Sequence, residues 1–197
     1  MRISSGFAKG LELKVPEGLA TRPTSAKVRA AVLNALQADL PEAEILELFA
    51  GSGALSIEAV SRGALGAVLV ERNRAAVQCL QKNVAELQRR ADAQKLARPE
   101  VHVQAQDVGD YLGKVAKNPS FDIVLVDPPY QEAVAWFRKL LGELPPLLKT
   151  NNQMVFESEE SAEEELNAEL AKSPKWQLLK QKHYGGTLVS TLCYNHE

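Results

Sequence analysis

Residues 47–53 read Glu-Leu-Phe-Ala-Gly-Ser-Gly and join an apolar run to the start of an expected helix. The run over residues 45–49 is typical of a buried strand, and residues 54–61 favour a helix. Gly51 and Gly53 allow a tight turn and a close approach of the backbone to a ligand. A helix that starts there offers free N–H groups and a positive dipole end to an anionic group. The stretch therefore predicts a strand–loop–helix unit with a ligand at the loop.

Strands and helices alternate along the chain after this unit. Short apolar runs predict further strands at residues 67–70, 101–105, 121–126 and 154–156. Helical periodicity predicts intervening helices at residues 73–90, around 111, at 133–141 and at 162–171. Residues 176–183 and 187–194 predict two strands joined by a turn at Gly185-Gly186. The alternation indicates an α/β fold with a mostly parallel sheet and a C-terminal antiparallel hairpin.

The first forty residues follow a different pattern from the rest. Residues 1–15 alternate roughly between apolar and polar side chains, which predicts a small β-hairpin that ends at Pro16. Thr24 or Ser25 can cap a helix that runs to about Gln37. We therefore expect an N-terminal extension over residues 1–40, ahead of a main domain over residues 41–197.

The composition is that of an ordinary globular protein, with 45% hydrophobic and 24% charged residues among 197. It excludes a disordered tail protein, a collagen-like chain and a disulfide scaffold. No apolar run approaches the roughly 20 residues that span a bilayer, and residues 1–10 lack the apolar core of a signal peptide. The two cysteines fit a reducing compartment. We expect a cytoplasmic protein.

Acidic residues stand where two of the expected strands end, the edge at which parallel sheets bind ligands. Glu71 follows the second strand, 20 residues after Gly51, and can accept hydrogen bonds from both hydroxyls of a ribose. Asp107 follows the third and can accept from the exocyclic amine of an adenine, with Asp110 as the rival. Alone, Glu71 could be a solvated carboxylate and Asp107 a helix cap. With the glycine loop, the two acids predict a nucleoside-binding cleft.

The fourth strand ends in Asp127-Pro128-Pro129-Tyr130, the most specific feature of the sequence. Two consecutive prolines hold the backbone rigid and extended. The Pro128 carbonyl and the Asp127 carboxylate could accept the hydrogens of an amino group, while Tyr130 stacks on a planar base. The alternative is a rigid loop with a half-buried tyrosine.

The sequence resembles the RsmD family, class I S-adenosylmethionine-dependent enzymes that methylate guanine N2 in 16S ribosomal RNA. The likeness rests on the following residues: Met1-Arg2-Ile3, Gly10, Arg22-Pro23-Thr24, Val28-Arg29, Asn34, residues 49–55, Glu58-Ala59, residues 61–64, residues 127–130, Tyr184-Gly185 and Thr187. Two departures are Ser56, where the family usually has glycine, and Glu47, where aspartate is commoner.

The resemblance implies a Rossmann-like sheet of seven strands. It also implies that S-adenosylmethionine is bound by the strand-end and loop residues Glu47, Phe49, Gly51, Gly53, Glu71 and Asp107. Asp127, Pro128 and Tyr130 would form the pocket for the target base. The substrate would be 16S ribosomal RNA, in an assembled or assembling small ribosomal subunit. We expect a monomer and no metal, because His102, His183 and His196 are scattered.

The net charge of −2 hides an uneven distribution. Residues 157–169 hold seven glutamates, which we expect on one helix turned away from RNA, and the rest of the chain then carries +5. Residues 1–40 hold six basic and three acidic side chains. These cations could form a solvated face or follow a phosphate backbone. We expect RNA contacts from Arg2, Lys9, Arg22, Thr24, Lys27 and Arg29.

Three other functions compete with this one. DNA adenine or cytosine-N4 methylases and protein glutamine methylases can share the Asp/Asn-Pro-Pro-Tyr pocket, although DNA enzymes usually carry a sizeable recognition region. An NAD-dependent oxidoreductase would need the third glycine that Ser56 replaces, and it does not explain the Pro-Pro-Tyr loop. A non-catalytic RNA-binding module would not bind S-adenosylmethionine.

Overall fold

The computed structural model describes residues 1–16, 26–118 and 120–197. It divides into two compact units, Met1–Tyr111 (unit 1) and Leu112–Glu197 (unit 2). The described part of the first forty residues belongs to unit 1. The boundary that we predicted at residue 40 is therefore not where the two units meet in sequence.

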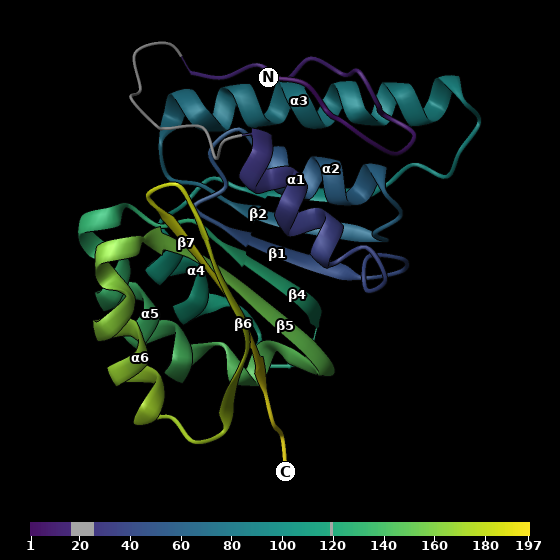
Figure 1. Cartoon of the computed structure of the whole chain (residues 1–197). Helices are drawn as coiled ribbons and strands as arrows, with labels where there is room; N and C mark the ends of the chain where they lie inside the picture. The colour runs from purple at the N-terminus through teal and green to yellow at the C-terminus, as the bar shows by residue number, and fades with distance from the viewer. Residues whose placement is uncertain (17–25, 119) are drawn as a thin grey trace. The chain divides into compact units, whose positions relative to one another are not determined.

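Unit 1 is built on three parallel strands, with β2 (Gly66–Val70) between β1 (Glu44–Leu48) and β3 (Glu100–Gln104). The apolar run of β1 is buried, as a strand covered on both faces requires. The helices of the unit are as follows: α1 (Ala26–Ala35), α2 (Ala54–Ser61), α3 (Arg74–Ala93) and the start of α4 (Val108–Lys114). Figure 1 shows α3 running the length of this unit.

The N-terminus of α3 is set by a side chain. Asn73 Oδ1 accepts hydrogen bonds from the backbone N–H groups of Ala75 (3.0 Å) and Ala76 (3.1 Å), which otherwise lack helical partners. The apolar side chains that follow at helical spacing are buried, namely Val77, Leu80, Val84, Leu87 and Ala91. Their burial fixes α3 against the strands behind the glycine loop.

The N-terminal segment forms the expected hairpin in irregular form: Ile3 N donates to Leu11 O (2.9 Å), Gly10 N to Ile3 O (2.9 Å) and Leu13 N to Met1 O (2.7 Å). The only β-bridge that the structure records there joins Arg2 and Glu12. The intervening residues dock on the end of α2, where Ser61 O accepts from Phe7 N (2.9 Å). Gly6 has φ +79°, and a Cβ there would lie 1.7 Å from Ser61 O. Hydrogen bonds between its two arms and contacts with α2 therefore hold this segment together.

Unit 2 is a mixed four-stranded arrangement. β4 (Phe121–Val126) is parallel to β5 (Leu148–Glu159), and β7 (Thr187–Tyr194) runs antiparallel between β5 and β6 (Trp176–Tyr184). Two helices accompany the strands, α5 (Ala133–Glu143) and α6 (Glu163–Ala171). Phe137 of α5 packs edge-on against Phe156 of β5, with ring centroids 5.0 Å apart.

The predicted fold class is confirmed: the chain forms a seven-stranded, mostly parallel α/β sheet with an antiparallel C-terminal hairpin. Two details were wrong. β5 has 12 residues, whereas we expected three. Glu157 and Glu159 lie on this strand and Glu160 in a 3-10 turn, so the seven glutamates do not share one helix. Among the described residues, no helix has the length and apolar character to cross a membrane.

Candidate active site

The glycine loop has a left-handed backbone at three of its residues. Phe49, Gly51 and Gly53 have φ values of 61°, 54° and 73°. A Cβ on Gly53 would lie 2.3 Å from Leu80 Cδ1, so helix packing requires this glycine, whereas a Cβ on Gly51 would meet nothing within 4 Å. For Phe49 the conformation costs on the order of 1–3 kcal/mol. Such strain is typical of ligand-binding turns.

Glu71, at the end of β2, is joined to the glycine loop. Its Oε2 accepts from Gly51 N (2.8 Å) and its Oε1 from Asn73 N (2.7 Å). Each carboxylate oxygen has two lone pairs, so both keep capacity for a ribose hydroxyl. The residues present therefore fit a nucleoside cofactor at this strand end.

Glu47 supports the glycine loop through the first turn of α2. Its side chain is buried, and its Oε2 accepts from Ser56 N (3.0 Å) in the first turn of α2. This hydrogen bond satisfies a backbone donor that Gly53, which has no side chain, cannot cap. The Ser56 hydroxyl is buried and has no hydrogen-bond partner among the described residues.

Asp107 caps α4, the alternative that the sequence left open. Its Oδ1 accepts from Gly109 N (2.8 Å) and its Oδ2 from Arg72 Nη1 (3.0 Å). Asp110 lies exposed in the first turn of the same helix. The geometry shows a structural role for Asp107, and its contact with an adenine stays a prediction.

The Asp127–Tyr130 loop follows β4 in unit 2. Asp127 is half-buried and Pro128 is buried. Pro129 has an extended backbone (φ −54°, ψ 129°), and Tyr130 begins a 3-10 turn. The hydroxyl of the half-buried Tyr130 lies 3.5 Å from Thr187 Oγ1 on β7. Thr187 is a family match in the sequence, but its contact with Tyr130 could not be predicted, because no local pattern links the two positions.

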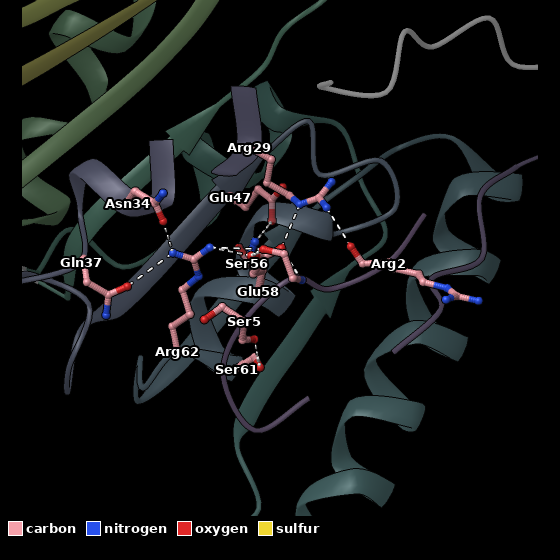
Figure 2. A network of polar contacts seen from close by, with 11 residues as sticks. Arg2, Ser5, Arg29, Asn34, Gln37, Glu47, Ser56, Glu58, Ser61 and Arg62 are labelled. Atoms are coloured by element: carbon pink, nitrogen blue, oxygen red, sulfur yellow. Dashed lines mark hydrogen bonds and ion pairs between the residues drawn. The ribbon is translucent and has the colours of Figure 1, made fainter. Parts of the chain in front are cut away.

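A buried ion-pair network joins the N-terminal segment, α1 and α2 (Figure 2). The side chain of Glu58 is fully buried, with Arg29 Nε 3.0 Å from its Oε2 and Arg62 Nη2 2.7 Å from its Oε1. Ser4 donates to the same carboxylate through its backbone N–H and its hydroxyl. Burial is the largest influence and opposes ionisation, but hydrogen bonds from Ser4, Arg62 and Arg29 together lower the pKa of Glu58.

This network corrects the expectation that Arg29 contacts RNA. Arg29 is only 2% exposed, and besides Glu58 it donates through Nη2 to Arg2 O (2.8 Å). Its cation is therefore used inside the fold. The signal was present in the sequence, since Arg29 lies four residues before Leu33 on the apolar stripe of its helix.

The other expected RNA contacts lie on the surface or outside the described residues. Lys9 and Lys27 are exposed. Arg2 is exposed and forms an ion pair with Glu12. Arg22 and Thr24, and the helix cap expected at Thr24 or Ser25, fall outside the described residues.

The fold, the glycine loop and the strand-end glutamate define a methyltransferase of the S-adenosylmethionine-dependent class. The family described as conserved hypothetical protein 95 matches residues 1–193, and the chain belongs to this family. The RsmD resemblance is thereby confirmed, since the chain is 36% identical to ribosomal RNA small subunit methyltransferase D of Escherichia coli K12. That match covers 94% of this chain and 85% of the relative.

Two further proteins are similar to this chain. Ribosomal RNA small subunit methyltransferase D of Haemophilus influenzae is 30% identical, over 100% of this chain and 94% of its own. The solved structure of a hypothetical protein from Thermus thermophilus has a TM-score of 0.75 and 28% identity. It covers 97% of this chain and 98% of its own length.

Proposed function

We propose that this protein methylates the exocyclic N2 amine of a guanine in 16S ribosomal RNA, using S-adenosylmethionine. The observation that carries the proposal is the Asp127–Tyr130 loop at the end of β4, in a chain whose relatives are named for methylation of small-subunit ribosomal RNA. Asp127, Pro128 and Tyr130 are the residues that we assign to the target base.

Unit 1 contains the residues that we assign to the cofactor. Glu71 receives the ribose hydroxyls, and the backbone at Gly51 lets the cofactor approach closely. Phe49 and Gly53 shape the loop, while Glu47 holds it from below. Asp107 is the proposed acceptor for the adenine amine, in addition to its capping role. Bound S-adenosylmethionine supplies an electrophilic methyl group on a sulfonium sulfur.

The target-base side must overcome the poor nucleophilicity of the guanine amine, whose lone pair is delocalised into the ring. The Asp127 carboxylate and the Pro128 carbonyl accept the two amine hydrogens, which favours a more tetrahedral nitrogen. Tyr130 stacks on the base and fixes its orientation. Alignment of this kind can lower a barrier by up to about 7–11 kcal/mol.

The target guanine must be unpaired or flipped to reach Tyr130. The exposed cations Lys9 and Lys27, with Arg22 and Thr24, are the proposed N-terminal contacts to the phosphate backbone. The proposed substrate is the assembled or assembling small subunit, and the proposed form is a cytoplasmic monomer. We expect Arg22→Ala to weaken RNA binding with no change in cofactor affinity.

Incubation with labelled S-adenosylmethionine and undermodified small subunits tests the proposal. The expected product is a single N2-methylguanine in 16S RNA, identified by nucleoside mass spectrometry and mapped by primer extension. Label on a ribosomal protein would instead indicate a protein methylase. Label that enters DNA adenine or cytosine would indicate a DNA methylase. Either result would overturn the proposed function.

A further inference from the structure

The hairpin of β6 and β7 contains a β-bulge that reverses the alternation of side chains. Leu178 pairs with Leu192, but Lys180 pairs with Thr191, so Leu179 is an extra residue on β6. A bulge of this kind moves the side chains beyond it to the other face of the sheet. If Leu179 were paired in regular register, Lys180 would instead share the face of Leu178.

The contacts beyond the bulge show which residues take which face. Gln181 Nε2 donates to Ser190 Oγ (3.0 Å), and the ring of His183 lies 3.2–3.3 Å from carboxylate oxygens of Glu160 and Glu163, beside α6. Those two side chains therefore face the helices of unit 2. Because side chains alternate along a strand, Lys180, Lys182 and Tyr184 face the opposite side.

This second face leads to the proposed base pocket. Cross-strand partners share a face of the sheet. Tyr184 pairs with Thr187, whose Oγ1 is the atom 3.5 Å from the Tyr130 hydroxyl. Lys182 and Lys180 continue the row away from Tyr130, at steps of about 6.8 Å along the strand.

The two lysines are available to bind a ligand. Both are exposed, and neither ammonium group has a hydrogen-bond or ion-pair partner among the described residues. Glu159 pairs with Thr187 and shares this face, but at the pocket end, where the N–H donors of a base are expected. Glu157 pairs with Val189 and lies in the row of Lys182, but its side chain is buried. The exposed charge of this face beyond the pocket end is therefore that of the two lysines, as a strand of nucleic acid running out of the pocket would require.

We propose that Lys180, Lys182 and Tyr184 form a second RNA-binding surface, which holds the strand next to the target guanine. The lysines contact successive phosphates, and Tyr184 packs on a neighbouring base or sugar. This inference rests on the proposed function. Lysines on an edge strand also discourage pairing with other chains, but that role needs exposure only and gives no reason for a bulge that turns both toward the face of Thr187.

The test compares the double variant Lys180→Gln/Lys182→Gln with the wild type in equilibrium binding to undermodified small subunits at several salt concentrations. We expect affinity to fall at least about fivefold at low salt. The slope of log K against log salt should become shallower by about 1–2, because each lost phosphate contact removes about 0.7–1. Affinity for S-adenosylmethionine should stay unchanged.

The matched control is Lys114→Gln/Lys139→Gln, which removes two exposed lysines from α4 and α5. It should bind subunits with the wild-type affinity and slope. If the β6 variant behaves like this control, or if it only self-associates in light scattering, the proposed surface is overturned. If binding to subunits depends on the two lysines but the wild type transfers no methyl group, the proposed function alone is contradicted.

Discussion

The residues that we assign to the cofactor and those that we assign to the target base are held in different ways. On the cofactor side, in unit 1, Glu71, Glu47 and Asp107 each accept a backbone hydrogen bond that fixes a loop or a helix end. On the target-base side, in unit 2, two prolines stiffen the loop covalently, and the Tyr130 hydroxyl makes one long contact. Substitutions on the cofactor side should therefore alter stability together with cofactor binding, whereas those at the base loop should act mainly on RNA binding and methyl transfer.

The largest effect is expected at Glu58, on the helix that begins directly after the glycine loop. Glu58→Ala leaves two buried arginines without their carboxylate, which costs about 3–5 kcal/mol of the free energy of unfolding. Chemical denaturation measures this loss. A cost below about 1 kcal/mol would show that unit 1 does not depend on the network.

The matched control is Glu169→Ala in unit 2, which also removes a glutamate that bridges two cations, Arg138 and Lys172. Hydrogen bonds from these cations lower the pKa of Glu169 to about 2, so the group is ionised near neutral pH. The two cations are 64% and 67% exposed, and water screens the interaction. The control should destabilise the protein far less than Glu58→Ala.

The next effect is expected at Asp127. Asp127→Ala removes an acceptor for the target amine and should slow single-turnover methylation about 10²–10³-fold. Asp127→Asn keeps a carbonyl oxygen and should recover part of this rate. Thermal unfolding of both variants measures any change in stability separately from the change in rate. A variant that methylates at the normal rate would remove Asp127 from the mechanism.

Glu71→Ala should show the mixed effect of the cofactor side. Loss of the hydrogen bonds to a ribose weakens S-adenosylmethionine binding about 10–100-fold, because hydrogen bonds to charged groups contribute roughly 1.5–3 kcal/mol. The N–H groups of Gly51 and Asn73 also lose their acceptor, so the melting temperature should fall. Calorimetry and thermal unfolding read the two effects separately, and unchanged cofactor affinity would contradict the assignment.

Two substitutions of Tyr130 distinguish stacking of its ring on the target base from hydrogen bonding by its hydroxyl. Tyr130→Ala loses a base–aromatic stack worth about 1–3 kcal/mol, so the KM for small subunits should rise. Tyr130→Phe keeps the ring and should behave like the wild type, since the contact with Thr187 is long. If Phe were as defective as Ala, the hydroxyl and not the ring would be the functional group.

The smallest effect is expected at Ser56. Ser56→Ala removes a buried hydroxyl and leaves the backbone N–H that binds Glu47 in place. Stability should rise by about 1 kcal/mol, because a buried polar group without a partner is costly. Denaturant unfolding checks this, and a loss of stability would reveal a partner for the hydroxyl in solution.

The sequence predicted those elements whose signals are local. The bounds of α2, β4 and β7 agree with the expected ranges, because apolar runs there end at glycines, at prolines or at a polar turn. It also placed Glu71 and Asp127 at strand ends, since the carboxyl edge of a parallel sheet follows from the alternation of strands and helices.

The remaining features depend on contacts between residues far apart in the chain. β5 continues through polar residues because the buried Asn152 exchanges hydrogen bonds with the backbone of Tyr194, at 2.9 and 3.0 Å. Arg29 is buried because Glu58 lies opposite it, 29 positions away. The apolar stripe of α1 indicates that Arg29 is buried, but neither pairing partner leaves a periodic pattern, so the partners could not be predicted from one sequence.

Our central claim is that unit 1 binds the cofactor and that the Asp127–Tyr130 loop of unit 2 binds the target base. The most direct test is the affinity of Asp127→Ala for S-adenosylmethionine, measured by calorimetry on the folded variant. If unit 1 alone holds the cofactor, the dissociation constant should stay within about twofold of the wild type while methyl transfer is lost. A tenfold weaker affinity, about 1.4 kcal/mol, would place Asp127 in the cofactor site and contradict the account.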